Sequence, residues 1–268
     1  MPLTEFICPD GEKRLVKDCL EHCPNKSGRC LSLPTLHSIG QIREWRGHPS
    51  TTQLLNPTRL EYLQITKPFA IDPFDQAFAL LGTRHHQTLE AVAKKLEGLE
   101  PEKYMRGEVS GIVDLLEPIN GGDQYRLIDY KTYGSYAVAK HLGLKEGEND
   151  KRKLALQLNN YRILAQGLGF NVAEIKAQVT VRDGNTRTAR ENGVTKNIYL
   201  LDVEILPDDE VQDYFITKAA ALSEALKTGE TELCEYEERW GGRRCKGYCS
   251  VFRFCSEGAQ VNKVELEK

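Results

Sequence analysis

The sequence has 268 residues, 40% of them hydrophobic, which is enough for one good-sized core with small appendages. A formal net charge of −3 excludes a uniformly basic surface, so positive charge that serves a polyanionic partner has to be local. No segment is long and apolar enough to cross a membrane, and residues 1–10 lack the basic-then-apolar pattern of a signal peptide. We therefore expect a cytoplasmic protein in a reducing compartment.

Eight cysteines gather at the two ends of the chain, with the spacings C-x10-C-x3-C-x6-C and C-x10-C-x3-C-x5-C. The first four are Cys8, Cys19, Cys23 and Cys30, and the last four are Cys234, Cys245, Cys249 and Cys255. In a reducing compartment such quartets are metal ligands or buried thiols rather than disulfides. Spacing alone does not choose between zinc and an iron–sulfur cluster. One quartet per metal is the simplest arrangement; the alternative joins one N-terminal cysteine to three C-terminal ones.

The segment 72–98 is predicted to form a long helix. Asp72 and Pro73 suit an N-cap followed by proline in the first turn, and Gly98 suits the end. An apolar stripe at helical spacing is expected to pack on the core; it consists of Phe78, Leu81, Leu89, Val92 and Leu96.

Two adjacent histidines lie in the middle of this helix. His85 falls on the apolar stripe, four residues before Leu89, and is expected to pack in the core. His86 falls on an adjacent face with Gly82 and Glu90, where a small residue leaves room for a ligand. His86 is therefore the histidine expected to bind a metal ion.

Two strands joined by a tight turn are predicted next. Residues 108–116 and 125–133 are rich in β-branched and apolar side chains, and Gly121-Gly122 between them indicates a hairpin with a two-residue loop.

The register of this hairpin is expected to bring three charged residues together. If Gly121 faces Gly122, Asp114 lies directly opposite Asp129, and Lys131 shares their face. Opposed carboxylates repel each other, and a divalent cation such as Mg²⁺ or Mn²⁺ removes that repulsion. Solvated carboxylates on an exposed strand are the alternative, but the apolar neighbours of both aspartates favour a metal site.

The rest of the chain alternates between helix and strand. Helices are predicted at 153–167 and from 207 to about 227, and strands at 174–182 and 197–205. Gln157 and Tyr161 lie one turn apart on the first of these helices, a pair that means little alone. The order predicts an α/β fold in which helices pack on a mixed sheet.

Four short motifs follow one another along the chain: Gly82-x3-His86, Gly111-Ile-Val-Asp114, Asp129-Tyr-Lys131 and Gln157-x3-Tyr161. In this order they resemble RecB-like nucleases of the PD-(D/E)xK superfamily, over roughly residues 56–255. The chain is most similar to the CRISPR-associated branch, which joins this core to an iron–sulfur cluster. The resemblance implies a restriction-endonuclease-like core, a central mixed sheet flanked by helices, and a metal-dependent deoxyribonuclease.

The resemblance also implies a role for each matching residue. The ligands of Mg²⁺ or Mn²⁺ would be His86, Asp114, Asp129 and the carbonyl of Tyr130. Lys131 would position or activate the attacking water and stabilise charge on the scissile phosphate. Gln157 and Tyr161 would orient the nucleic-acid strand and the lysine. Such a set suits phosphodiester hydrolysis, which needs a metal ion and a cation beside the developing negative charge.

The sequence departs from the family pattern in three places. The acid before Lys131 is Asp rather than the commoner Glu, and Val113 stands in place of the proline that names the superfamily. Many relatives place the first cluster cysteine after a segment like 56–62, but no cysteine follows it here. The first cluster ligand would then be Cys234 or an N-terminal cysteine such as Cys30, and the additional N-terminal quartet suggests a separate zinc module.

Basic side chains cluster near the expected site and beside the C-terminal cysteines, where they could track phosphates. They are Lys103, Arg106, Lys140, Lys145, Lys151, Arg152, Lys153, Arg239, Arg243 and Arg244, with Tyr133, Tyr136 and Trp240 available for base stacking. Acidic residues at 146, 148 and 150 dilute the middle group.

Together these features predict three parts. A zinc module at 1–50 precedes a nuclease core at 51–230, and residues 231–268 hold a 4Fe-4S cluster or zinc. We expect an exonuclease or end-processing nuclease that acts on single-stranded DNA ends, with partner proteins from helicase, recombination or CRISPR-adaptation systems. The alternatives are a catalytically silent nuclease-like binding or assembly module, and a zinc-dependent nucleic-acid-binding protein whose central carboxylates are incidental.

Overall fold

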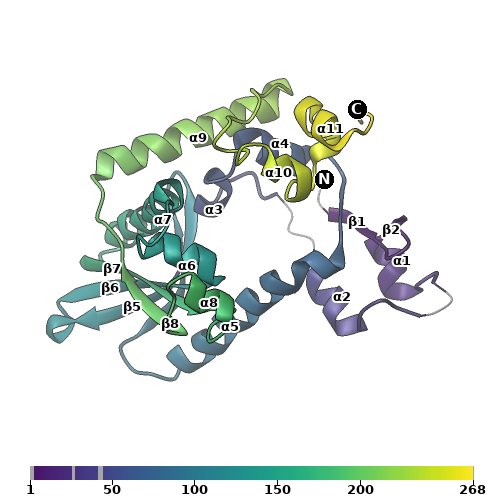
Figure 1. Cartoon of the computed structure of the whole chain (residues 1–268). Helices are drawn as coiled ribbons and strands as arrows, with labels where there is room; N and C mark the ends of the chain where they lie inside the picture. The colour runs from purple at the N-terminus through teal and green to yellow at the C-terminus, as the bar shows by residue number, and fades with distance from the viewer. Residues whose placement is uncertain (1–2, 26–27, 42–44, 268) are drawn as a thin grey trace. The chain divides into compact units, whose positions relative to one another are not determined.

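The computed structural model describes residues 3–25, 28–41 and 45–267, and it divides into two compact units (Figure 1). Unit 1 consists of Met1–Pro49, Asn56–Leu80 and Lys218–Lys268, and unit 2 consists of Ser50–Leu55 and Leu81–Thr217. All eight cysteines therefore belong to unit 1, whereas the residues expected to form the nuclease site belong to unit 2.

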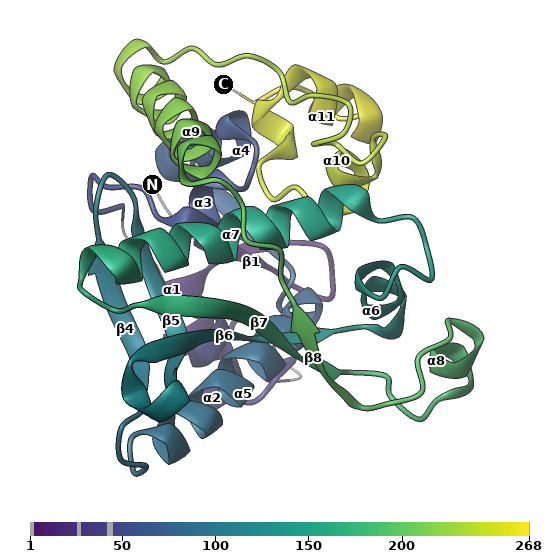
Figure 2. The ribbon, with the colours of Figure 1, turned by 90° about the vertical axis from the view of Figure 1, so that its left-hand side faces the viewer.

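Unit 2 is built on a five-stranded mixed sheet (Figure 2). In spatial order its strands are β4 (Glu100–Arg106), β5 (Ser110–Ile119), β6 (Gln124–Tyr133), β7 (Val172–Val181) and β8 (Ile198–Asp202). Neighbouring strands are antiparallel except β6 and β7, which are parallel. The mixed sheet is therefore confirmed. β4 was not predicted, because Glu100-Pro101-Glu102-Lys103 lacks the alternation of apolar and polar residues that indicates a strand.

Helices pack on both faces of this sheet. The chain passes from β6 to β7 through α6 (Ser135–His141) and α7 (Glu148–Gly167), because a parallel pair requires a crossover. α7 contributes Leu154, Leu158 and Ala165 to the main core, which also contains Leu127 and Val179 of the sheet. On the opposite face, α5 (Ala77–Ala93) packs on the sheet; the cluster there contains Leu89, Ala93, Leu115, Ile128 and Tyr130.

Three further helices include residues of unit 2: α3 (Thr51–Leu54), α8 (Arg187–Glu191) and α9 (Asp208–Thr228), whose first half lies in this unit. The buried Arg162 of α7 holds the start of α9, because its Nη2 lies 3.1 Å from the carbonyl oxygen of Leu206 and 2.5 Å from Oδ1 of Asp208. Among the described helices, none combines the length and apolar character that crossing a bilayer requires.

The loop between β5 and β6 is longer than the two-residue turn expected. Ile119 and Gln124 form the last pair of the ladder, so four residues, 120–123, connect the strands. Asn120, Gly121 and Gly122 all have positive φ values, of 51°, 79° and 99°. The two additional residues lengthen the loop symmetrically, so the register is the one predicted, with Leu115 paired to Ile128.

The helix expected over 72–98 is shorter and more exposed than predicted. Asp72 caps a 3-10 turn, η1 (Pro73–Gln76), by accepting a hydrogen bond from the backbone N–H of Phe74, and α5 ends at Ala93. The prediction of a buried apolar stripe was wrong for four of its members, since Phe78, Leu81, Val92 and Leu96 are all more than half exposed. Periodicity identified the helix, but of this stripe only Leu89 packs on the sheet.

Unit 1 combines a small sheet with short helices. The sheet has the order β2-β1-β3, formed by β1 (Leu3–Ile7), β2 (Lys13–Leu15) and β3 (Phe69–Ile71). The other elements are α1 (Val16–Glu21), α2 (Leu33–Ile39), α4 (Thr58–Thr66), α10 (Arg243–Gly247), η3 (Phe252–Phe254) and α11 (Ser256–Asn262). One small core surrounds Phe6 and Leu36, and a second surrounds Leu63 and Val251. The parallel β1–β3 pair joins the N-terminal segment to residues more than sixty positions further along the chain.

Gly111 of β5 marks a close approach of α7 to the sheet. A Cβ atom at this position would lie 2.6 Å from Cε1 and 2.8 Å from Cδ1 of Tyr161, whose ring is buried. Contacts this short do not occur in folded proteins, so only glycine fits beneath the tyrosine. This accounts for the first residue of the segment Gly111-Ile-Val-Asp114.

Replacing Gly111 with alanine is expected to lower the free energy of unfolding by about 1–3 kcal/mol, because the Tyr161 ring has to move. Gly167→Ala, at the end of the same α7, is the matched control, since a Cβ there meets nothing within 4 Å. Urea unfolding compares the two variants with the wild type. Equal stability of both variants would contradict the packing role of Gly111.

Candidate functional site

β5 and β6 separate where their acidic residues lie. The ladder ends at the pair Leu115–Ile128, so Asp114 and Asp129 lie one step beyond it. Instead of a ladder bond, the backbone N–H of Tyr130 donates to Asp114 Oδ2 at 2.6 Å. Both carboxylates are buried, with 8% and 3% of their surface exposed. The two aspartates therefore lie near each other in an opened pair rather than as a regular cross-strand pair.

His86 reaches this opening from α5. Its Nδ1 lies 3.2 Å from Oδ1 of Asp114, and this hydrogen bond raises the pKa of His86, although burial acts in the opposite direction. When Nδ1 donates to the carboxylate, Nε2 carries the lone pair of the neutral ring and is available to a metal ion. The neighbouring His85 is half-buried, and its Nε2 lies 3.3 Å from Oγ1 of Thr180.

Glu102 of β4 is a site residue that the sequence analysis missed. It lies between Pro101 and Lys103, whose ladder partners flank Asp114 on β5. Potential ligand atoms of His86, Glu102 and Asp114 all lie within 4.8 Å of one another. Burial raises the pKa of Glu102, and the charge of Asp114 adds to the rise. Its backbone φ of 48° is unusual for a residue that is not glycine. The sequence carried no signal, since one glutamate in a polar segment resembles a solvated strand.

Asp129 and Lys131 form an ion pair beside this trio. Nζ of Lys131 lies 2.5 Å from Oδ2 of Asp129, and that oxygen has no hydrogen bond of regular geometry. Burial opposes the charge of Lys131, but Asp129 outweighs it, so the pKa of Lys131 is raised and the ammonium stays charged. Burial raises the pKa of Asp129, and Asp114 adds to the rise against the attraction of Lys131. The site thus concentrates negative charge that a cation would stabilise.

Gln157 and Tyr161 of α7, which also belong to unit 2, are hydrogen-bonded to each other. Nε2 of Gln157 donates to the Tyr161 hydroxyl at 3.2 Å, and Oγ1 of Thr52 lies 3.5 Å from the same hydroxyl. Burial raises the pKa of Tyr161, so the hydroxyl stays protonated. The pair is therefore held in place by α7, by α3 and by the glycine of β5.

The basic cluster expected near the site is partly neutralised. Lys140 pairs with Asp150 at 2.6 Å and Lys103 pairs with Glu100 at 2.9 Å. Tyr136 is 56% exposed, and the ammonium groups of Lys140 and Lys145 lie 5.2 and 5.4 Å from its ring centre. An exposed aromatic ring with two cations thus lies on α6, directly after the strand that carries Lys131.

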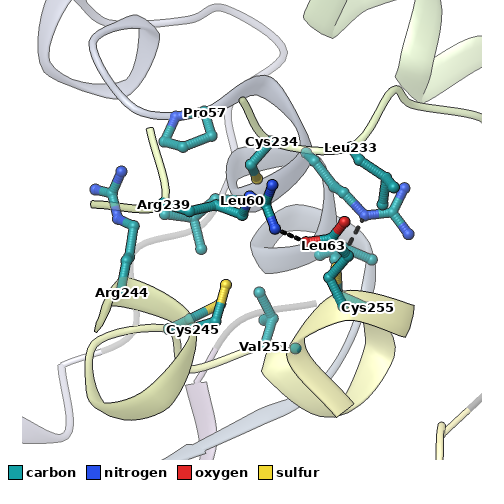
Figure 3. A pocket seen from close by; sticks show the side chains of 14 residues that line it. Pro57, Leu60, Leu63, Leu233, Cys234, Arg239, Arg244, Cys245, Val251 and Cys255 are labelled. Carbon is teal, nitrogen blue, oxygen red and sulfur yellow. Dashed lines mark hydrogen bonds and ion pairs between the residues drawn. The ribbon is translucent and has the colours of Figure 1, made fainter. Parts of the chain in front are cut away.

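The four C-terminal cysteines line one pocket in unit 1 (Figure 3). The space not filled by atoms, part of it open to solvent, is about 450 Å³. Apolar walls come from Leu60, Leu63 and Val251, and three arginines also reach the pocket. Burial raises the pKa of Cys234 and of Cys249 to about 11, so the thiols are neutral without a metal. The structure thus groups Cys234, and not Cys30, with the three last cysteines.

The four N-terminal cysteines form a second group of thiols in unit 1. Cys8 begins a tight turn, in which the N–H of Gly11 donates to its carbonyl oxygen, and Cys19 is buried in α1. Burial raises the pKa of Cys19, and the nearby thiols of Cys23, Cys8 and Cys30 add to the rise. The sulfur of Cys23 lies 3.9 Å from the carbonyl oxygen of Gly28. The four thiols of this quartet are therefore neighbours.

The model of the PD-(D/E)XK nuclease superfamily matches residues 76–256, which is more than half of the chain. The chain belongs to the PD-(D/E)XK nuclease superfamily. Members of this superfamily are typically metal-dependent nucleases and generally use Mg²⁺ or Mn²⁺. The crystal structure of SSO0001 is similar with a TM-score of 0.45 and 16% identity, over 90% of this chain and 92% of that chain. The comparison with curated proteins gave no match.

Replacing Glu102 with glutamine is expected to weaken Mn²⁺ binding roughly 10- to 100-fold, because a charged oxygen ligand is lost next to Asp114. Glu97→Gln is the control, since Glu97 is exposed after the end of α5 and is not among the residues whose charge shifts the pKa of Glu102. Isothermal titration of each full-length variant with Mn²⁺ measures the affinity. Wild-type affinity in the Glu102 variant would remove this residue from the site.

Proposed function

We propose that this superfamily member hydrolyses DNA at single-stranded ends, as an exonuclease or end-processing nuclease. The observation that carries the proposal is the trio of His86, Glu102 and Asp114 beside the buried Asp129–Lys131 pair. Such a site offers oxygen and nitrogen ligands for a hard cation and a permanent positive charge within the same unit.

The residues fit a divalent cation, since buried carboxylates repel one another without one. His86, Glu102, Asp114 and Asp129 would hold it, with the Tyr130 carbonyl as a further ligand. A cation bound there supplies positive charge to the scissile phosphate and lowers the pKa of a bound water. Lys131 stays protonated, so it stabilises the developing negative charge and orients the attacking water rather than removing its proton. Gln157 and Tyr161, which are both uncharged and hydrogen-bonded to each other, would orient the nucleic-acid strand and Lys131.

Recognition of single strands is supported by the exposed aromatic ring on α6. Tyr136 is open to solvent and carries Lys140 and Lys145 near its ring. Unpaired bases stack on such rings while ammonium groups contact phosphates, whereas the stacked bases of a duplex do not present their faces. A strand end bound at Tyr136 would enter the site from the C-terminal end of β6.

The test is cleavage of end-labelled single-stranded DNA with Mg²⁺ or Mn²⁺. Asp129→Ala and Lys131→Ala are each expected to abolish product formation, because one removes a ligand and the other a cation needed in the transition state. Asp202→Ala and Lys196→Ala are matched controls on exposed positions of the same unit. Full activity in the first two variants, or DNA binding without cleavage by the wild type under either metal, would contradict the assignment.

We further propose that the C-terminal quartet holds a 4Fe-4S cluster. Four cysteines line one largely apolar pocket, and two of them, Cys245 and Cys255, are buried in it, as suits a group held away from water. Cys234, Cys245, Cys249 and Cys255 would be the ligands.

For the N-terminal quartet we propose zinc. The core around Cys8, Cys19, Cys23 and Cys30 has few buried residues, and a bound metal would supply the stability that such a small core lacks.

Anaerobic purification with elemental analysis and a visible spectrum tests both metals. Cys245→Ser is expected to remove the iron and the brown colour and to leave the zinc, because its pocket lies apart from the other quartet's ligands. Cys19→Ser is expected to remove the zinc and to leave the iron and the brown colour. A colourless wild type with two zinc ions per chain would refute the cluster, and an absence of zinc in the wild type would refute the N-terminal assignment.

A further inference from the structure

Arg59 of α4 donates a hydrogen bond to one thiol of the cysteine-lined pocket. Its Nε lies 3.3 Å from Sγ of Cys255. Nη1 of the same guanidinium donates to the carbonyl oxygen and to Oγ1 of Thr231, at 3.0 and 2.9 Å. Thr231 therefore holds the planar group in a fixed orientation, in which one N–H points at the sulfur.

The arginines of the pocket differ in their partners. Arg239 forms an ion pair with Glu257. Arg244 donates to Oδ1 of Asn56 and to the carbonyl oxygen of Glu238, and the acceptors of Arg59 are likewise uncharged. Arg59 and Arg244 thus line the same pocket as the four cysteines, two of which, Cys234 and Cys249, have pKa values that burial raises to about 11.

Burial lowers the pKa of Arg244, although the nearby carboxylates of Glu238 and Glu61 oppose that shift. Thiolates bound to a metal centre would add further negative charge beside both arginines. Arg59 is the better placed of the two cations, since it already donates to a ligand sulfur, whereas Arg244 donates to a backbone oxygen and an amide oxygen.

We infer that Arg59 tunes the metal centre through its hydrogen bond to Cys255 and raises the reduction potential of the cluster. The inference rests on the proposed 4Fe-4S centre. A cluster that accepts one electron gains one negative charge, and an N–H donor on a ligand sulfur stabilises the more negative state. Arg59 is thus a positioning and tuning residue, not a ligand.

The test compares Arg59→Leu with Arg59→Lys in the full-length protein. The first removes the charge and the hydrogen bond, and the second keeps the charge but loses the planar Nε donor. Arg253→Leu is the matched control, because it removes the same charge from the same region but does not line the pocket. Each protein is purified without oxygen and titrated with dithionite, which supplies the one electron, while the reduced cluster is followed by electron paramagnetic resonance.

We expect Arg59→Leu to make one-electron reduction about tenfold less favourable, a shift of about 59 mV to more negative potential. Arg59→Lys should shift the potential by less in the same direction, and Arg253→Leu should match the wild type. Potentials of both Arg59 variants equal to that of the control would overturn the inference while leaving the cluster in place. A wild type without a cluster would instead overturn the cluster and the inference together.

Thr231→Val provides a second route if Arg59→Leu does not fold. This variant removes one acceptor that orients the guanidinium but leaves Arg59 and all four cysteines. A smaller negative shift with wild-type iron content would support the inference, and an unchanged potential would count against it.

Discussion

The opening between β5 and β6 is the feature on which the candidate site depends. In a regular ladder the N–H of Tyr130 would bond to a carbonyl oxygen of the neighbouring strand, but here it bonds to the carboxylate of Asp114. This exchange satisfies a buried backbone donor and fixes a charged ligand with the same bond. Oδ1 of Asp114 is then left to face His86, so helix α5 and both strands meet at one carboxylate.

Support for the opening comes from both faces of the sheet. The ring of Tyr161 packs directly on Gly111, so α7 is fixed in position against β5 three residues before Asp114. From the other face, α5 presents His86 while Leu89 packs on the sheet. The site therefore stands on rigid elements, and the short motifs of the sequence correspond to packing requirements as well as to chemistry.

Much of this site could be predicted from the sequence, because hairpin pairing is local. Gly121 and Gly122 fixed the centre of the turn, and adding a residue on each side left the pairing register unchanged as far as Leu115 and Ile128, one step before the two aspartates. The opening itself was not predictable, since it depends on a side chain replacing a ladder bond. Glu102 was missed because β4 has no apolar alternation, and Arg59 because 196 residues separate it from Cys255. The exposed stripe of α5 shows that helical periodicity does not reveal how much of a helix is covered.

The segments that form the cysteine-lined pocket also have a consequence for how the protein is made. Leu60 and Arg59 precede Leu81–Thr217, the long segment of unit 2 that forms its sheet, whereas the four cysteines follow it. On the ribosome, unit 2 can therefore complete its sheet while the pocket still lacks every one of its thiols. A metal centre bound by all four thiols can be completed only after Cys255 has been synthesised, when every residue of the nuclease core is already in the chain and free to fold.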